Sequence, residues 1–261
     1  MTNFNEVSLV ILDIDGVIYN NHTIVQGASE AVMLLRKHGL VVKFLTNDAI
    51  SSRSLRAQEL NALGFDVLAS DIYTATSLTA HYLQLVGSPR TLLLLEGEGK
   101  QEFQELPIVE YNPQCVVVGD CFNSYSFDKL NRAFIAIRNG AIFIAMQRNR
   151  CWSIDGDLVI DTGFWVAGLE YCTGVSAHVI GKPSIESYLI VCQEAGVIAE
   201  QAVMVSDDIS SDLFGAFKAG LLTVHVTDYF VPSNLETLVK PDLIVPDLNK
   251  FAEQLCSCRR M

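Results

Sequence analysis

Short apolar runs alternate with segments of helical spacing along much of the chain. Residues 7–15, VSLVILDID, form a continuous apolar run that ends in acids, which is typical of a strand buried in a parallel sheet. Residues 29–39 then place apolar side chains at helical spacing, and residues 40–46 form a second apolar run. Residues 51–64 begin with serine and close at glycine, as a second helix would. This strand–helix–strand–helix order predicts an α/β fold with a Rossmann-like, doubly wound parallel sheet.

The middle of the chain repeats this order with apolar residues of its own. A helix is expected over 71–86, followed by strands at 91–97, 115–120 and 141–146 and helices at 126–140 and 163–174. The first pattern resumes near residue 179, with helices at 184–196 and 212–219, strands at 202–208, 221–227 and 242–247, and a short C-terminal helix. We therefore expect a discontinuous core domain, residues 1–80 and 179–261, and an inserted α/β cap domain, residues 81–178.

Composition and charge narrow the classes of partner. Half of the 261 residues are hydrophobic and 18% are charged, which supplies a large core and gives no sign of disorder. The formal net charge of −12 repels nucleic acid and anionic membranes, so neither is expected as a partner. The seven cysteines form no CxxC pair, and no apolar window is long enough to span a membrane. With no signal peptide recognised, we expect reduced thiols and a cytoplasmic protein.

Polar side chains cluster where the expected core strands end. They are Asp13 and Asp15, then Thr46, Asn47 and Asp48, then the loop Gly181, Lys182 and Pro183, and finally Ser206, Asp207, Asp208 and Asp212. Ligands of open parallel sheets bind beyond the carboxyl ends of the strands. Each group alone has an ordinary interpretation, since an acid often caps a helix and Gly-Lys-Pro is often only a turn. Their shared placement instead predicts one site that combines carboxylates, a hydroxyl group and a lysine.

These groups carry a resemblance to a known family. DIDGVIY (13–19), LTND (45–48), GKP (181–183) and SDDISSD (206–212) resemble the four motifs of the haloacid dehalogenase-like hydrolase superfamily. The insertion point and the segment DGDLVIDTGFWVAGLEYCTG (155–174) resemble its subgroup IIA, the NagD and 4-nitrophenylphosphatase type with a large α/β cap. The cap is most similar to phospholysine phosphohistidine inorganic pyrophosphate phosphatase-like members.

The resemblance implies a Mg²⁺-dependent phosphatase that hydrolyses a small phosphorylated metabolite through an aspartyl-phosphate. Asp13 would be the nucleophile, and Asp15 would act as general acid and then general base. The carboxylates of Asp13 and Asp207 and the backbone carbonyl of Asp15 would hold Mg²⁺. Asp212 would orient a metal-bound water from outside the ligand set.

The resemblance also implies how the phosphoryl group is bound. Thr46 and the backbone amide of Asn47 would contact its oxygens, and Lys182 would bind it and offset its repulsion from Asp13. Two positions depart from the family pattern. Ser206 stands where glycine is usual, and Asp48 stands where many relatives carry asparagine, so we expect Asp48 to tune substrate charge and both to affect efficiency.

Two arginines in the cap are candidates for substrate contact. Arg148 and Arg150 lie in the segment 145–153, which in the subgroup reaches over the active site. We hypothesise that they meet an anionic group of the substrate, because a guanidinium suits bidentate binding of phosphate or carboxylate. The alternative is that both lie on a solvated loop. Caps of the subgroup often mediate dimers, which leaves a homodimer through the cap open.

Two other functions remain open at this stage. One is a non-catalytic module that binds metal and a phosphorylated ligand, and the other is a phosphotransferase. The presence of Asp13, Asp15, Lys182 and Asp207 together favours the hydrolase, since pure binding needs no proton-transfer residue. A dinucleotide-dependent oxidoreductase is disfavoured because no GxGxxG follows the first strand.

Overall fold

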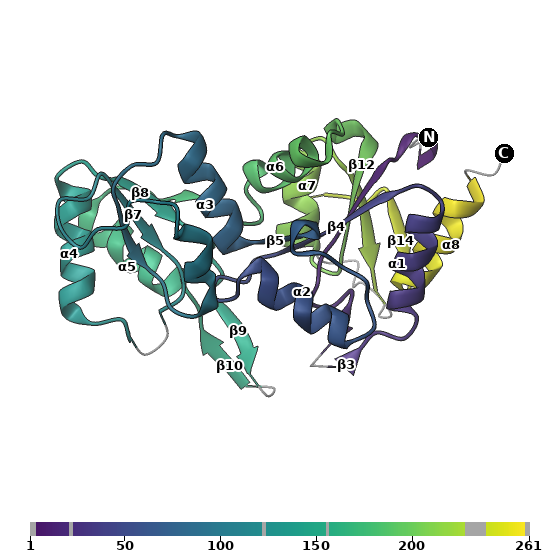
Figure 1. The fold of residues 1–261 in the computed structure, drawn as a ribbon, viewed down its shortest axis with the longest axis horizontal. Coiled ribbons are helices and arrows are strands. Elements are labelled where there is room, and N and C mark those ends of the chain that lie inside the picture. The colour runs from purple at the N-terminus through teal and green to yellow at the C-terminus, as the bar shows by residue number, and fades with distance from the viewer. Residues whose placement is uncertain (1–3, 21–22, 122–123, 155–156, 228–238, 259–261) are drawn as a thin grey trace. The chain divides into compact units, whose positions relative to one another are not determined.

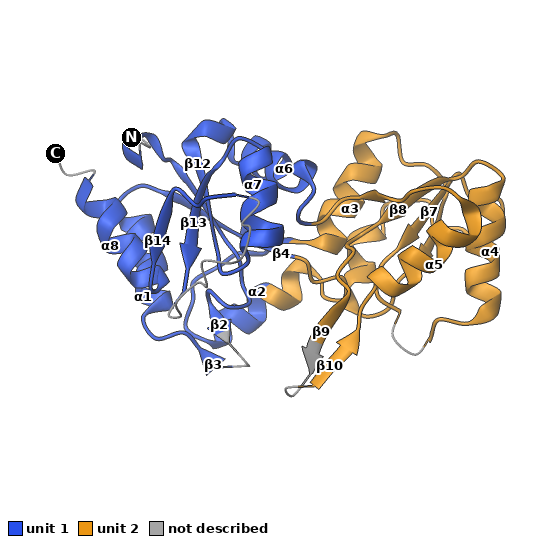
Figure 2. Ribbon diagram, turned by 180° about the vertical axis from the view of Figure 1, so that it is seen from behind, with its two compact units in different colours: residues 1–46, 57–73, 182–261 blue, residues 47–56, 74–181 orange. Residues whose placement is uncertain are grey.

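The computed structural model describes most of the chain. The described residues are 4–20, 23–121, 124–154, 157–227 and 239–258. They form two compact units, of which the first comprises residues 1–46, 57–73 and 182–261 and the second residues 47–56 and 74–181 (Figure 2). These limits differ from the expected boundaries near 80 and 179. One reason is that α3 (Ala75–Leu85) packs within the second unit against the 3-10 segment Glu98–Phe103.

A six-stranded sheet forms the centre of the first unit (Figure 1). Its strands, in spatial order, are β14 (Leu243–Val245), β13 (Leu222–Val226), β12 (Ala202–Ser206), β1 (Leu9–Leu12), β4 (Val41–Thr46) and β5 (Ile72–Thr74). The chain moves outward from β1 through β4 to β5, and later from β12 through β13 to β14. The order therefore reverses between β1 and β12, which pair in parallel, and this reversal is where doubly wound sheets bind ligands.

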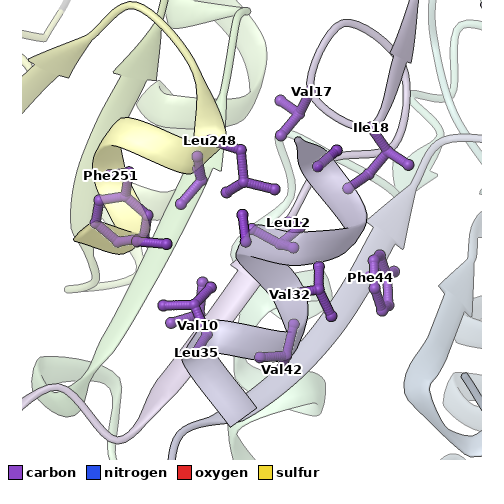
Figure 3. Close-up of a cluster of buried hydrophobic side chains, with 14 of the residues drawn as sticks. Val10, Leu12, Val17, Ile18, Val32, Leu35, Val42, Phe44, Leu248 and Phe251 are labelled. Atoms are coloured by element: carbon purple, nitrogen blue, oxygen red, sulfur yellow. The ribbon is translucent and has the colours of Figure 1, made fainter. Parts of the chain in front are cut away.

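Helices cover this sheet and form the core with it. They are α1 (Ala28–Lys37), α2 (Arg53–Ala62), α6 (Ile185–Ala195), α7 (Phe214–Lys218) and α8 (Leu248–Cys258), and a small hairpin joins β2 (Tyr19–Asn20) to β3 (Thr23–Ile24). Figure 3 shows Leu12 of β1 among Val32 of α1 and Leu248 and Phe251 of α8, all of which are buried. Every residue of β1 is buried, which explains its unbroken apolar run.

The second unit has a smaller sheet of its own. Its parallel strands, in spatial order, are β11 (His178–Val179), β8 (Ile142–Ala145), β7 (Cys115–Val118) and β6 (Thr91–Leu94). Its remaining elements are the helices α3, α4 (Phe127–Arg138) and α5 (Gly163–Thr173) and the antiparallel hairpin of β9 (Cys151–Ile154) and β10 (Asp157–Ile160). Val118, Ala133 and Val166 represent a core that β7, α4 and α5 share.

The α/β class and the parallel, doubly wound sheet are confirmed, but local details differ. The helix expected over 71–86 begins only at Ala75, because Ile72–Thr74 extends as β5 and Thr74 then caps α3 by accepting from the Ser77 N–H at 3.1 Å. The helix expected from Asp212 begins within a π-helical turn, Ile209–Leu213. The two hairpins were not predicted. Within the described parts of the chain, every helix is too short or too polar to cross a bilayer.

Candidate active site

Asp13 occupies the first position after the central strand β1. Its backbone N–H continues the ladder to Val205 of β12 at 3.0 Å, which fixes the residue at the carboxyl edge of the sheet. Its side chain is buried, and one carboxylate oxygen accepts from the Ile14 N–H at 2.8 Å. Asp15, two residues on, is exposed. The chain turns sharply after it, since Gly16 has a φ of 80° and donates to the Tyr19 carbonyl at 2.8 Å.

Lys182 joins Asp13 to Asp212. Its Nζ lies 2.6 Å from Asp13 Oδ1 and 2.6 Å from Asp212 Oδ2, and all three side chains are buried. Burial alone would lower the pKa of Lys182, but the two adjacent carboxylates outweigh it and raise the pKa above its usual range. The lysine is therefore a fixed cation, positioned by the turn that precedes α6.

One cation does not neutralise two buried carboxylates. Burial raises the pKa of Asp13, and the neighbouring Lys182 only partly offsets this. Burial likewise raises the pKa of Asp212 to about 7, with Lys182 opposing the shift and Asp13 adding to it. The cluster thus carries excess negative charge in a desolvated setting, and a further cation would stabilise it.

Asp207, the first residue after β12, lies directly against the turn that follows β1. A Cβ atom added at Gly16 would lie 2.2 Å from Asp207 Oδ2, so no side chain larger than hydrogen fits there. The residue as a whole is exposed, yet desolvation of its carboxylate and the charges of Asp212 and Asp208 raise its pKa. The acid that follows β12 therefore lies against the turn that follows β1, at the same edge of the sheet as Asp13.

The donor set of this region fits a hard divalent cation. Mg²⁺ prefers oxygen ligands and retains several waters, so it needs few protein groups. Among the described residues, no three Asp, Glu, His or Cys side chains converge into a cage of their own. The expected set requires only two carboxylates, from Asp13 and Asp207, with the Asp15 carbonyl and water. Excess carboxylate charge around Lys182 supports that fit.

Three further side chains hold the acids in place. Ser206 Oγ donates to Asp212 Oδ2 at 2.8 Å, and Tyr188 donates to the Asp212 carbonyl at 2.8 Å. His225, opposite Ser206 on β13, has its Nε2 3.1 Å from the Asp207 carbonyl. The sequence suggested none of these contacts. Ser206 stands out only as a departure from glycine, and neither His225 nor Tyr188 belongs to a motif.

Asp208 has a structural contact of its own. One of its carboxylate oxygens accepts from the Ser210 N–H at 2.8 Å and the Ser211 N–H at 3.0 Å, which caps the turn that leads to α7. The three acids that follow β12 therefore differ in environment. Asp207 faces Gly16, Asp208 caps a turn, and Asp212 contacts Lys182.

The expected phosphoryl-binding residues lie at the end of β4. Thr46 is the last residue of that strand and is buried, and β4 pairs in parallel with β1, so Thr46 shares the sheet edge with Asp13. Asn47 and Asp48 follow it and belong to the second unit. The Asp48 carboxylate accepts from the Ile50 N–H at 2.7 Å.

Asp48 also forms an ion pair with Arg56 and accepts from the Ser51 N–H at 2.9 Å. Burial opposes ionisation here, but Arg56 and the two backbone amides together lower the pKa of Asp48. These contacts order the loop before α2. A contact of Asp48 with substrate would require the carboxylate to leave these donors, and that role stays a prediction.

The two cap arginines have different surroundings within the second unit. Arg148 forms an ion pair with Glu170 of α5. Arg150 is exposed, and its guanidinium has no ion-pair partner among the residues that the structure describes. Gln147 donates to Asp161 at 2.6 Å, and both are buried, which ties the start of this loop to the end of β10. Contact of Arg148 and Arg150 with substrate stays a prediction.

Comparisons with known proteins agree on one family. A model described as haloacid dehalogenase-like hydrolase matches residues 10–108, and one described as HAD-hydrolase-like matches residues 179–251. The chain is 34% identical over 232 residues to the phospholysine phosphohistidine inorganic pyrophosphate phosphatase of Rattus norvegicus, covering 86% of this chain and 85% of that one.

Solved structures show the same relationship. A 4-nitrophenylphosphatase from Thermotoga maritima has a TM-score of 0.88 at 27% identity, covering 96% of this chain and 98% of its own. NagD from E. coli K-12 has a TM-score of 0.86 at 27% identity, covering 94% of this chain and 98% of its own.

The fold, the motifs and these similarities define a haloacid dehalogenase-like hydrolase, and the chain belongs to that superfamily. Within it, the relatives and structural neighbours are those of subgroup IIA, the NagD and 4-nitrophenylphosphatase type. The predicted membership is confirmed. The protein is accordingly an enzyme of the phosphatase class, a phosphoric monoester hydrolase.

Proposed function

We propose that this phosphatase is Mg²⁺-dependent and hydrolyses a small phosphorylated metabolite with Asp13 as its nucleophile. The observation that carries the proposal is the position of Asp13. Its buried carboxylate lies 2.6 Å from the Lys182 ammonium, at the edge where Asp207 meets Gly16. A carboxylate and a phosphate monoester repel each other, and the Lys182 ammonium together with a bound divalent cation would reduce that repulsion.

In the proposed reaction, an oxygen of Asp13 attacks phosphorus and the bond to the leaving oxygen breaks. Asp15 gives its proton to the leaving oxygen, and the aspartyl-phosphate on Asp13 remains. Asp15 then takes a proton from water, which attacks the phosphoryl group and releases Asp13 and phosphate. The exposed position of Asp15 suits exchange of its proton with solvent.

Asp13, Asp207 and the Asp15 carbonyl would hold the metal ion, with Asp212 acting through water. When bound, Mg²⁺ would supply positive charge that neutralises part of the charge on nucleophile and substrate. Lys182 binds the phosphoryl group, and its charge favours the ionised form of Asp13 against the effect of burial. Thr46 and the Asn47 amide bind the remaining phosphoryl oxygens.

The substrate proposal stays at the level of chemical class. The name of the rat relative includes phospholysine, phosphohistidine and pyrophosphate, so phosphoramidates and pyrophosphate belong in a substrate screen together with phosphate esters. Arg150 binds a second anionic group of the substrate.

We also propose a cytoplasmic protein without nucleic-acid or membrane partners, and a homodimer through the cap.

Hydrolysis of p-nitrophenyl phosphate with Mg²⁺ tests the proposal, with Asp13→Asn as the variant and Asp242→Asn as a matched control outside the site. We expect Asp13→Asn to lower kcat by about 10³-fold or more, as loss of a nucleophile does in other enzymes. Asp242→Asn should retain activity. Acid quenching should trap label from ³²P-labelled substrate on the wild type and not on Asp13→Asn.

Two outcomes would contradict the proposal. Equal turnover by wild type and Asp13→Asn would favour a module that binds phosphorylated ligands without catalysis. Transfer of the phosphoryl group to added alcohols in preference to water, seen by product analysis, would favour a phosphotransferase.

A further inference from the structure

The hydroxyl group of Ser206 contacts two different parts of the candidate metal site. As a donor it bonds Asp212 Oδ2 at 2.8 Å, and as an acceptor it receives the Asp208 N–H at 3.1 Å. Its distance to Asp13 Oδ2 is longer, 3.5 Å. Ser206 is fully buried as the last residue of β12, so water does not replace these bonds when the hydroxyl is absent.

The two donors to the Asp212 side chain meet the same oxygen. Lys182 Nζ lies 2.6 Å and Ser206 Oγ lies 2.8 Å from Oδ2, while Oδ1 receives no hydrogen bond from the described residues. An ammonium group is a point charge that leaves a carboxylate free to rotate. A second donor from a different direction fixes the plane of the carboxylate and the direction in which Oδ1 faces.

The backbone of this turn has contacts that do not involve Ser206, although the Asp208 N–H does bond its hydroxyl. His225 contacts the Asp207 carbonyl from β13 at 3.1 Å, and Tyr188 donates to the Asp212 carbonyl at 2.8 Å. Loss of the Ser206 hydroxyl should therefore disturb the orientation of the Asp212 side chain more than the path of the backbone. This separates a positioning role from a general role in folding.

We propose that Ser206 is a positioning residue that orients the Asp212 carboxylate, so that its Oδ1 is available to a water of the metal ion. The inference rests on the proposed function, because it assigns Asp212 to that water. This role explains why a hydroxyl-bearing residue stands where glycine is usual in the family. In this role Ser206 acts through Asp212, to which its hydroxyl makes its shortest bond.

The test measures metal binding apart from turnover. Mn²⁺ binding to the full chain is followed by electron paramagnetic resonance for wild type, Ser206→Ala, Ser206→Gly and Ser206→Thr. Loss of the hydroxyl should weaken Mn²⁺ binding about tenfold, the lower end of the range found when hydrogen-bond partners of metal ligands are removed, because Ser206 acts one step further out, through Asp212. The value of kcat should fall similarly, while KM at saturating Mg²⁺ stays within about twofold, and threonine should restore most of the affinity.

Thr223→Val is the matched control. Thr223 lies on the neighbouring strand β13, is fully buried, and bonds a carboxylate, that of Asp242, at 3.0 Å, outside the site. Its substitution removes a buried hydroxyl from the same sheet and should leave Mn²⁺ affinity unchanged. Thermal unfolding of every variant reports the cost to stability separately.

The outcomes distinguish this inference from the proposed function. Wild-type Mn²⁺ affinity in Ser206→Ala would overturn the positioning role, even if activity fell through lost stability. Equal weakening in Thr223→Val would also overturn it, because the effect would then belong to the sheet in general. Absence of Mn²⁺ and Mg²⁺ binding by the wild type would refute the proposed metal dependence first, and the inference with it.

Discussion

Replacing Asp212 with asparagine should change how the stability of the metal-free protein depends on pH. Asp212 is buried, and its pKa is raised from 3.8 to about 7. The folded state therefore binds this proton more tightly than the unfolded state does. Protonated Asp212 therefore contributes most to stability at low pH. This contribution is lost as the pH rises from the pKa of the unfolded state toward 7. Asparagine carries no proton to lose, so Asp212→Asn lacks this dependence.

The magnitude follows from the two pKa values. Between pH 5 and 7, the unfolded carboxyl is ionised and the folded one is largely protonated, and each pH unit is worth about 1.4 kcal/mol. From pH 5 to pH 8, the unfolding free energy of Asp212→Asn should therefore rise by about 3 kcal/mol relative to wild type. The difference in unfolding free energy at any one pH also depends on how well the new amide packs. The change of that difference with pH is therefore the diagnostic quantity.

Urea unfolding in EDTA at several pH values measures this difference. Asp242→Asn serves as the control, because it removes one negative charge from the same unit outside the site. A constant difference between Asp212→Asn and wild type from pH 5 to pH 8 would refute the reasoning. Added Mg²⁺ should remove most of the wild-type loss at high pH, since a bound cation stabilises the ionised carboxylates.

Three further predictions concern other positions. Gly16→Ala should abolish Mg²⁺-stimulated turnover, because its Cβ would overlap Asp207 at 2.2 Å and its φ of 80° suits only glycine; wild-type activity in a steady-state assay would contradict this. Phe251→Ala should lower the unfolding free energy by about 3–5 kcal/mol in urea, since a fully buried ring is removed. Asp48→Asn should lower Tm at pH 7, and the difference from wild type should shrink as the pH falls below the unfolded value of 3.8, because the pKa of Asp48 is lowered in the folded state and its ion pair with Arg56 is lost on acidification; a difference in Tm that does not change with pH would contradict this.

The sequence predicted the first sheet well because its signals are local. The apolar run of β1 is unbroken, since both faces of that strand are buried, and helices with clear apolar spacing follow it. The short strand β5 was missed because Ile72–Thr74 is three residues long and continues directly into α3. The hairpin of β9 and β10 was missed because apolar residues such as Leu158 and Ile160 are exposed there. The order of apolar and polar residues in this segment therefore does not follow burial.

For the candidate site, motif spacing predicted which residues converge but not how they are held. Lys182 and Asp13 lie 169 residues apart, and their placement near strand ends and their family motifs predicted that they would meet. The bond from Ser206 to Asp212 depends on the π-helical turn that returns Asp212 to the strand end, which no spacing rule predicts. The ion pair of Asp48 with Arg56 depends likewise on the path of the loop before α2.

The pairing of β1 with β12 has a consequence for synthesis of the chain. Asp13 and Ser206 are 193 residues apart, so during translation one edge of β1 has no partner until most of the protein has emerged. An apolar strand with an open edge is prone to pair with other chains. Nascent or truncated chains that end before β12 should therefore depend on chaperones, and they would lack the strand that borders Asp13.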